Sequence, residues 1–411
     1  MIRHDARLLP LDDESVDLIV TSPPYFALRS YRDKGKHYDS QIGSEDTPEA
    51  FLEALDGCMV EWRRVLKPSG SVWINLGDKY AGSSGQSTHG TGSSALHLGP
   101  HPATTKTVAS TGGQGWSGDT HIRTKSLMGL PWRFAIRQID AGWILRAEVV
   151  WSKPNGLPES VTDRVRRSHE QWFHFVKEPR YFSAVDEIRE PGQTAPNPYR
   201  KLSTRRSDLL DEPRDQTRPT LSFQMDAPHP LGRLPGSVWT IPTEPLIIPD
   251  AVREAQSLPD HFAAFPQEWP RRIILGWSPS GVCVECGEGR RPVVSKEAQG
   301  PPRGQTATDR YQRVRSAVSG GQPTGTDVDV RLVGHACACP EPTATTTPAV
   351  VLDPFGGTGT VAGVARTLGR YGITNDLSAD YNRLAIWRIW ESGHFTKTEQ
   401  RTWSDRQTRL I

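Results

Sequence analysis

Short apolar runs, each closed by glycine, proline or an acidic residue, are the strongest pattern along this chain. Runs of this length that are rich in β-branched and aromatic residues are typical of buried strands. Because parallel sheets are covered on both faces, their strands are nearly continuously apolar, and the pattern therefore indicates an α/β fold. We predict strands at residues 17–20, 171–177, 350–352 and 371–376, and either a strand pair or one bent strand at 143–151.

Apolar residues at helical spacing fill several segments between these runs. Residues 48–67, 130–138 and 267–277 place apolar side chains three or four positions apart, which predicts amphipathic helices. Pro270 is compatible with the third helix because it falls in the first turn, where a missing N–H costs nothing. A further helix is predicted to begin at Thr360, which we interpret as its cap.

Two long stretches lack any such periodicity. Residues 81–120 are dominated by Gly, Ser, Thr and His and predict a loop, which is either a lid over a ligand or a segment without function. Residues 179–237 are rich in Pro, Arg and Asp, with basic residues gathered at 199–201 and 205–206. By composition alone, this second stretch is typical of a solvated linker.

Composition narrows the classes of protein. The chain of 411 residues is long enough for one elaborated domain or roughly two to three smaller units. Its net charge of +2 is not that of a strongly basic protein, so nucleic-acid contacts have to come from local patches. No apolar run is long enough to span a membrane, and residues 1–5 lack the apolar core of a signal peptide. We therefore expect a soluble, cytoplasmic protein with no membrane partner.

The sequence TSPPY at positions 21–25 directly follows the first predicted strand. In open α/β sheets, ligands bind beyond the carboxyl ends of the strands. Pro23 and Pro24 have no N–H and a fixed φ, so this loop offers carbonyl oxygens without competing donors. With the Ser22 hydroxyl before them and the Tyr25 ring after them, the loop suits a flat heterocycle that carries an amino group. An ordinary proline turn is the alternative for the Pro-Pro pair alone.

A glycine-rich turn follows the strand at 350–352 and leads into a helix. Glycines let the backbone approach a ligand closely, and a helix N-terminus favours a carboxylate or a phosphate. Asp376 ends the next predicted strand, where an acidic residue can bind two ribose hydroxyls. This spacing favours a nucleoside ligand over a plain packing turn. The turn is neither G-x-G-x-x-G nor G-x-x-x-x-G-K-[ST], so a dinucleotide or a triphosphate fits poorly.

Four of the five cysteines form two close pairs, Cys283 with Cys286 and Cys337 with Cys339. So few cysteines in a chain with intracellular features argue against a disulfide scaffold and favour a metal. Four thiolates in two knuckles fit a structural zinc ion, with no open position left for catalysis. Unliganded thiols and redox activity are the alternatives. We interpret the Gly-, Pro- and Arg-rich stretch between the pairs as a loop.

Together these motifs resemble the amino-methylating DNA methyltransferases that use S-adenosylmethionine. Members of that family hold the target base in a [S/D/N]-P-P-[Y/F/W] motif and the cofactor in a second motif. Further segments resemble the family's other motifs in the expected order, at residues 62–78, 125–133, 151–155 and 261–266. The catalytic motif comes first here and the cofactor motif last, which resembles the permuted arrangement called the beta group. The resemblance implies an α/β fold with a doubly wound, mostly parallel, Rossmann-like methyltransferase sheet and permuted motif order.

The resemblance also implies roles for single residues. Ser22 and the Pro23 carbonyl would accept the amino N–H bonds of a flipped base, and Tyr25 would stack on that base. Asp353 and the glycine loop would hold the methionine end of S-adenosylmethionine, Asp376 its ribose, and a phenylalanine its adenine. The implied catalytic set is Ser22, Pro23, Pro24 and Tyr25, and the implied cofactor set is Asp353, Phe355, Gly356, Gly357, Gly359, Asp376 and Phe262.

The expected organisation of the chain follows from these assignments. The position of the Pro- and Arg-rich stretch, between the two halves, is where relatives of this group carry their target-recognition region. We expect a catalytic half at 1–178, this target-recognition region at 179–237, a connecting segment at 238–280, a zinc-knuckle insert at 281–340 and the S-adenosylmethionine-binding half at 341–411.

We therefore expect a site-specific methyltransferase of double-stranded DNA, of bacterial or phage origin, with a cognate restriction endonuclease as a possible partner in restriction–modification. Ser22 stands where many adenine-modifying relatives carry Asp, which favours cytosine N4 over adenine N6 as the methylated atom. No Pro-Cys pair occurs, which argues against methylation of cytosine carbon 5. The alternatives are methylation of RNA or of a protein glutamine by a similar proline motif, and a non-catalytic, zinc-containing nucleic-acid-binding protein with a degenerate methylase core.

Overall fold

The computed structural model describes residues 1–27, 32–33, 36–37, 41–82, 122–156, 159, 161–190, 231–259, 264–298, 328–339, 344–393 and 395. Its strands are β1 (Val16–Thr21), β2 (Arg32–Asp33), β3 (Lys36–His37), β4 (Leu66–Leu76), β5 (Ile144–Ser152), β6 (His169–Val176), β7 (Val238–Thr240), β8 (Val282–Cys283), β9 (Arg291–Ala298), β10 (Val328–Ala336), β11 (Thr346–Thr347), β12 (Val350–Asp353) and β13 (Tyr371–Thr374). Its helices are α1 (Pro48–Val65), α2 (Leu130–Asp140), α3 (Asp250–Gln256), α4 (Glu268–Trp277), α6 (Thr360–Thr367) and α7 (Ala379–Ile386), with a 3-10 helix at Val185–Ile188 and a π-helix at Trp387–Glu391.

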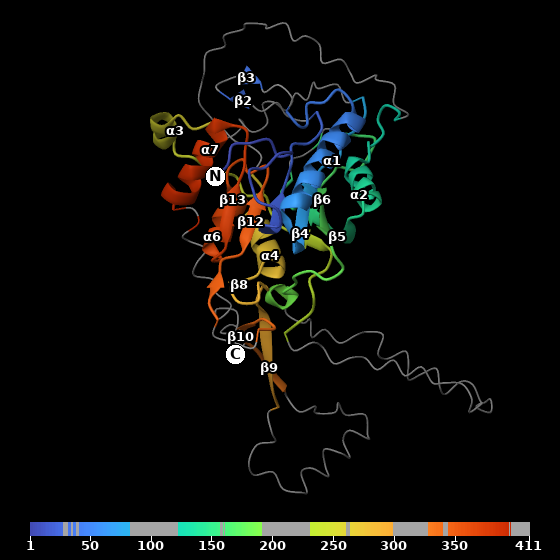
Figure 1. Cartoon of the computed structure of the whole chain (residues 1–411). Coiled ribbons are helices and arrows are strands. Elements are labelled where there is room, and N and C mark those ends of the chain that lie inside the picture. The colour runs from blue at the N-terminus through green and yellow to red at the C-terminus, as the bar shows by residue number, and fades with distance from the viewer. Residues whose placement is uncertain are drawn as a thin grey trace, which may run out of the picture. The chain divides into compact units, whose positions relative to one another are not determined.

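Seven of the described strands form one sheet in the order β13-β12-β1-β4-β6-β5-β7. Within it β6 runs antiparallel to β4 and β5, and the other pairings are parallel. β1 pairs with β12, with Leu18 opposite Val351, so strands from the two ends of the chain meet inside the sheet. Figure 1 shows the orange C-terminal strands beside the blue N-terminal ones. The predicted mostly parallel sheet is confirmed.

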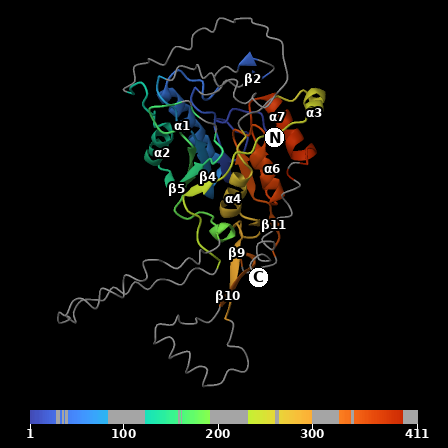
Figure 2. The same ribbon diagram turned by 180° about the vertical axis from the view of Figure 1, so that it is seen from behind.

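Helices cover both faces of this sheet. Because successive side chains of a strand point to opposite faces, one strand packs against both layers of helices. Phe173 and Phe175 of β6 belong to the core that includes the apolar faces of α1 and α2. The opposite face carries tryptophans, and Trp172 of β6 stacks on Trp269 of α4 with ring centroids 4.8 Å apart. Trp73 of β4 adds to this layer. α1 and α2 lie together and apart from α4 and α6 in the reverse view as well (Figure 2).

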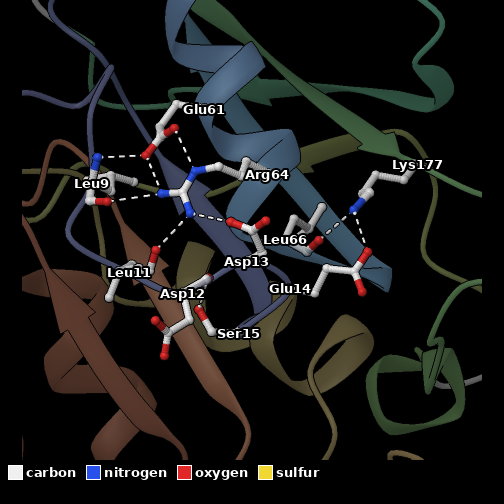
Figure 3. A network of polar contacts seen from close by, with 10 residues as sticks. All are labelled: Leu9, Leu11, Asp12, Asp13, Glu14, Ser15, Glu61, Arg64, Leu66 and Lys177. Carbon is white, nitrogen blue, oxygen red and sulfur yellow. Dashed lines mark hydrogen bonds and ion pairs between the residues drawn. The ribbon is translucent and has the colours of Figure 1, made fainter.

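A polar network fixes the segment that leads into β1. The Arg64 guanidinium, near the end of α1, contacts the carboxylates of Glu61 and Asp13 at 2.6 Å each. The same group donates to the carbonyl oxygen of Leu11 over 2.8 Å, and Glu61 accepts from the Leu9 N–H over 2.7 Å. Arg64 lowers the pKa of Glu61. These contacts converge on Arg64 (Figure 3), and they hold residues 9–13 against α1, which sets where β1 begins.

Three predictions about local structure are settled by these elements. The segment 143–151 is a single strand, β5, with a register shift between Leu145 and Ala147. The stretch between the cysteine pairs was predicted as a loop, and this is wrong for β9 and β10, which pair with each other. Their short valine and leucine alternations are outweighed by the surrounding Gly, Pro and Arg. The cap of α6 is Gly359 with φ 71°, and Thr360 is the first helical residue, because glycine adopts left-handed backbone freely.

The chain divides into two compact units. The first comprises Met1–Ala184, Gly236–Arg291 and Cys337–Ile411, and it contains the seven-stranded sheet and the four paired cysteines. The second comprises Val185–Pro235 and Pro292–Ala336.

Parts of three predicted segments lie outside the described residues: the loop at 81–120 beyond residue 82, residues 191–230 of the region expected to recognise DNA, and residues 299–327 and 340 of the expected zinc insert. None of the helices in the described ranges combines the length and the apolar composition needed to cross a bilayer.

Candidate active site

The proline motif and the glycine-rich motif meet at one edge of the sheet. β1 and β12 are parallel neighbours, so the loops that follow them leave the sheet at the same edge. The Thr21 hydroxyl donates to the Asp353 carboxylate, with 2.7 Å between the oxygens. Thr21 is fully buried, and Asp353 is 2% exposed. A buried hydrogen bond therefore joins two motifs that lie at opposite ends of the sequence.

The side chains of the TSPPY loop reach toward β4 and β6. The Tyr25 hydroxyl lies 2.6 Å from Asn75 Oδ1 and 2.9 Å from Glu170 Oε2. The Ser22 hydroxyl donates to the same Asn75 oxygen over 3.3 Å. Gly77 backs the tyrosine ring so closely that a Cβ there would lie 2.5 Å from Tyr25 Cε2. Ser22 and Tyr25 are half-buried, so part of each side chain is open to a ligand.

The other two members of the proline motif complete the predicted catalytic set. Pro23 is buried and Pro24 is half-buried. The structure thus brings all four predicted catalytic residues together in one short loop at the end of β1, beside the start of the glycine-rich turn.

The pKa of the buried Asp353 carboxyl lies close to neutral pH. Burial raises the pKa of its carboxyl from 3.8 to about 7, against the opposing effect of hydrogen bonds from the Thr21 hydroxyl and the Phe355 N–H. The Phe355 N–H donates to it over 3.1 Å. The carboxylate of Asp376 adds to the upward shift. A positively charged ligand beside Asp353 would favour the ionised carboxylate, because opposite charges stabilise each other in a buried site.

The glycine-rich turn brings bare backbone to the edge of the sheet. The Gly356 N–H donates to the Asn375 carbonyl over 2.7 Å. A Cβ at Gly356 would lie 1.5 Å from Thr374 Oγ1, so the space beside this residue is already filled. Gly359 occupies the left-handed region at the start of α6. No larger residue fits at Gly356 without displacement, which is what a close backbone turn requires.

Asp376 follows β13 and ties the glycine-rich turn to the start of α7. Its carboxylate accepts from the Gly357 N–H over 3.0 Å and from the Ser378 N–H over 2.8 Å. A carboxylate offers about four acceptor positions, so these contacts are compatible with ribose hydroxyls as further donors. The side chain is half-buried. The structure therefore places Asp376 beside the glycine loop, as its sequence position predicts.

The two aromatic residues expected over the cofactor adenine have different outcomes. Phe355 is half-buried and lies edge-on to Trp62, with ring centroids 6.1 Å apart, so part of its ring packs on the core. Phe262 lies outside the described residues.

Three polar residues around the proline motif were missed by sequence reasoning. Asn75 is 1% exposed, and its Nδ2 donates to the Gln171 carbonyl over 3.0 Å. Glu170, at the start of β6, pairs with the ammonium group of Lys153. Asn75 was visible as the one polar residue within the apolar run 72–76. Glu170 gave no such signal, because the residues before it are charged and polar.

A buried arginine supports the glycine-rich turn from behind. Arg388 is 2% exposed and donates to the hydroxyl oxygens of Thr358 and Thr360 over 2.7 and 2.6 Å. Burial lowers the pKa of Arg388 to about 10. An arginine near the end of a helix is normally solvated, so the sequence offered no sign of this contact.

Three of the four paired cysteines lie together. The Sγ atoms of Cys283, Cys286 and Cys337 are all within 4.8 Å of one another. Cys339 is half-buried and does not belong to this group. Hydrogen bonds from the backbone N–H groups of Cys286 and Glu285 lower the pKa of the Cys283 thiol to about 7, which favours the thiolate. Converging thiols in a tight turn are the donor set that zinc prefers.

Comparison with known proteins identifies the family. The sequence pattern of the family described as DNA methylase matches residues 16–284, more than half of the chain, and this match includes the proline motif. The chain belongs to this DNA methylase family. Its relatives include the type II methyltransferase M.SmaI of Serratia marcescens, which is 31% identical over 295 residues, covering 70% of this chain and 78% of the relative.

Other similar proteins match over different shares of their length. The type II methyltransferase M.XycI of Xanthomonas campestris pv. cyanopsidis is 39% identical over 182 residues, or 44% of this chain. The chain spans 54% of the length of that relative. Among solved structures, the PvuII DNA methyltransferase described as cytosine-N4-specific aligns with a TM-score of 0.49 and 15% identity, over 97% of this chain and 90% of the other.

Proposed function

We propose that the protein is a site-specific methyltransferase that transfers a methyl group from S-adenosylmethionine to the exocyclic amino group of a base in double-stranded DNA. The observation that supports this most directly is the Thr21–Asp353 hydrogen bond of 2.7 Å. It places a loop of acceptors suited to an amino heterocycle beside a turn suited to a nucleoside. Methyl transfer requires these two ligands side by side, because the reacting atoms have to be held in line.

The proline motif acts on the base. An exocyclic amino group is a poor nucleophile because its lone pair is delocalised into the ring. The Ser22 hydroxyl and the Pro23 carbonyl accept its two N–H bonds and draw the nitrogen toward tetrahedral geometry. Tyr25 stacks on the base, which has to leave the duplex at a cost of a few kcal/mol. The Ser22 proton is directed to Asn75, so the lone pairs of the hydroxyl are available to accept.

The glycine-rich motif fits S-adenosylmethionine, which supplies an electrophilic methyl sulfonium when bound. Gly356, Gly357 and Gly359 bring the backbone close, and the start of α6 favours the methionine carboxylate. Asp376 accepts the ribose hydroxyls. Asp353 holds the methionine end, where the positive charge favours its ionised form. Phe355 or Phe262 covers the adenine.

Cytosine N4 is the preferred target atom, and adenine N6 is the alternative. Ser22 is a weaker proton acceptor than the aspartate of many adenine-modifying members of the family. Methyl transfer can precede proton loss, because the methylated amine is a strongly acidic cation, so a strong base is not required. This argument favours cytosine and remains compatible with adenine.

Nucleoside mass spectrometry tests both levels of the proposal. Unmodified genomic DNA from a methylase-deficient bacterial host would be incubated with the protein and S-adenosylmethionine, then digested to nucleosides. We expect N4-methylcytosine. N6-methyladenine alone would overturn the cytosine assignment and leave the function intact. If calorimetry detects no S-adenosylmethionine binding and no methylated nucleoside forms, the chain is instead a non-catalytic nucleic-acid-binding protein with a degenerate core.

The surrounding context is part of the same proposal. Residues 179–237 form the target-recognition region, in which Arg and Lys contact phosphates and base edges. The relatives carry the name type II methyltransferase, which supports a cytoplasmic role in restriction–modification beside a cognate endonuclease. The permuted motif order matches the pairing of β1 with β12 from opposite ends of the chain.

We also propose that the cysteine group holds one structural zinc ion, with Cys283, Cys286 and Cys337 as ligands and Cys339 as the fourth. Clustering of three thiols within 4.8 Å supports this, and movement of the Cys339 side chain completes a tetrahedral set. Protein purified without chelator should carry about one zinc per chain, lost together with stability in Cys283→Ser and Cys286→Ser.

The control for zinc is Cys58→Ala, because Cys58 is buried in the core away from the group and its replacement should leave the metal content unchanged. If Cys339→Ser retains zinc, Cys339 is not the fourth ligand and another group fills that position. Protein purified without chelator and found to hold no zinc would contradict the metal site.

A further inference from the structure

The Tyr25 hydroxyl contacts two acceptors at once. Asn75 Oδ1 lies at 2.6 Å and Glu170 Oε2 at 2.9 Å. A phenol carries one proton, so it donates to one of these oxygens at a time or shares the proton between them. Two acceptors around one hydroxyl fix the direction of the C–O bond, and because a phenol O–H prefers the plane of its ring, they also favour one orientation of the ring plane.

Both acceptors are themselves held in place. The Asn75 amide donates from Nδ2 to the Gln171 carbonyl over 3.0 Å, which turns Oδ1 toward the loop. The Glu170 carboxylate pairs with Lys153, whose ammonium lies 4.1 Å from the centroid of the Trp151 ring. These contacts leave neither acceptor free to rotate away from Tyr25.

The acceptors lie at the edge of the sheet where β1 ends. Asn75 is near the end of β4, which runs parallel to β1. Glu170 is near the start of β6, which runs antiparallel to β4. The rigid sheet therefore carries the groups that orient a loop residue. Gly77 lies against the Cδ2–Cε2 edge of the ring, where the lack of a side chain leaves space for it.

We infer that Asn75 and Glu170 are positioning residues that lock the Tyr25 ring as a preformed platform for the flipped base. This inference rests on the proposed function. Stacking alone needs only a ring, and a phenylalanine supplies one. In this chain the hydroxyl serves orientation, because it aims the ring before the base arrives. Asn75 also accepts from Ser22 over 3.3 Å, so one amide aligns both side chains that meet the base.

A double-mutant cycle tests this coupling. The variants are Tyr25→Phe, Glu170→Gln and the two combined, with Glu148→Gln as the matched control, since Glu148 lies on the same sheet and has no part in the site. The assay is the initial rate of tritium transfer from labelled S-adenosylmethionine to unmodified bacterial genomic DNA, both at saturation. The midpoint of thermal unfolding and the S-adenosylmethionine Kd are measured alongside.

Each single variant should lower the rate roughly three- to tenfold, the scale of one hydrogen bond. The double variant should be no slower than Tyr25→Phe, because the glutamate acts only through the hydroxyl. The cofactor Kd should stay within about twofold in all variants, and Glu148→Gln should match the wild type.

Two results would overturn the inference. Multiplicative losses in the double variant would mean that Glu170 acts independently of Tyr25. A rate for Glu170→Gln equal to that of the wild type would mean that the carboxylate does not orient the ring. An inactive wild-type protein would instead contradict the proposed function, so the two failures are distinguishable.

Discussion

The loops that follow β1 and β12 leave two neighbouring parallel strands at the same edge of the sheet. They differ in the atoms that anchor them: side chains in the first loop and backbone in the second. The TSPPY loop is anchored by side chains, with Ser22 and Tyr25 directed to Asn75 and Glu170. The glycine-rich loop is anchored by its backbone, whose N–H groups donate to Asn375 and Asp376. In the first loop the hydroxyl protons of Ser22 and Tyr25 are already donated, so the loop offers oxygen acceptors to a ligand. In the second loop the glycine backbone can approach a ligand closely.

This difference matches what the two proposed ligands need. An amino heterocycle requires acceptors and a flat ring, which side chains and prolines supply. S-adenosylmethionine requires close approach of the backbone, acceptors for its ribose hydroxyls and a helix start for its methionine carboxylate, which the glycines, an aspartate and the start of α6 supply. Substitutions in the first loop should therefore impair chemistry, and substitutions in the second should impair cofactor binding.

The largest separation is expected from Ser22→Ala/Tyr25→Ala. Removing an acceptor and the stacking ring should lower methyl transfer at least about 100-fold, since misplaced reacting groups cost that much. The S-adenosylmethionine Kd should stay within about twofold, because neither side chain belongs to the second loop. Transfer assays and calorimetry measure the two effects. Full activity in this double variant would remove the proline motif from the site.

Gly356→Ala should show the opposite separation. The new Cβ would lie 1.5 Å from Thr374 Oγ1, so the loop has to shift, at a cost of about 1–3 kcal/mol in the free energy of unfolding. S-adenosylmethionine binding should fall with it. Gly236→Ala is the matched control, because a Cβ there meets nothing within 4 Å. Equal affinity and stability in both variants would show that the turn tolerates side chains.

Asp376→Ala should weaken S-adenosylmethionine binding by roughly 1.5–3 kcal/mol, the scale for a charged hydrogen-bonding partner. Part of this loss passes through the amides of Gly357 and Ser378. A 2′-deoxy analogue of the cofactor separates the two contributions. Wild-type protein should discriminate against the analogue and Asp376→Ala should not. Equal discrimination in both would mean that Asp376 supports the loop without touching the ribose.

The buried Asp353 carboxyl, which links the two loops through Thr21, predicts a smaller, pH-dependent effect on the free energy of unfolding. Burial raises the pKa of Asp353 from 3.8 to about 7, so the folded state keeps a proton that the unfolded chain releases. Stability should therefore fall as pH rises between these values and level off above them. Relative to Asp353→Asn, the wild-type free energy of unfolding should fall by at most ~1.4 kcal/mol per pH unit. Parallel pH profiles from denaturant titrations would contradict this.

The central strands β1 and β12 could be predicted because they are buried on both faces, which leaves a continuous apolar run in the sequence. The runs at 17–20 and 350–352 match β1 and β12 closely, and the loops after them follow from the parallel arrangement. β9 and β10, of eight and nine residues, were missed because charged and polar residues interrupt their apolar positions and the surrounding sequence is rich in Gly and Pro. The cap of α6 was misassigned by one residue because threonine is a preferred capping residue. The cap is instead the preceding Gly359, in the left-handed region.

The site was predictable where chemistry lies within one loop, and not where it depends on pairing between strands. Ser22 and Tyr25 are adjacent in sequence to the features that reveal them. Glu170 reaches Tyr25 only because β6 runs antiparallel beside β4, and the register of that pairing is not encoded in either strand alone. From the sequence alone, Asn75 is an amide within an apolar strand, and only its contacts with Tyr25 and Gln171 reveal its place in the site.

The most direct test of the account is sequencing of genomic DNA from a host that expresses the protein, by a method that detects methylated amino groups. Wild-type protein should modify one short sequence motif throughout the genome, at cytosine N4. Protein with Ser22→Ala/Tyr25→Ala, expressed to the same level, should leave that motif unmodified. Methylation that persists in the variant, or a genome without any modified motif in cells with soluble wild-type protein, would contradict amino-methyl transfer at the edge of the sheet shared by β1 and β12.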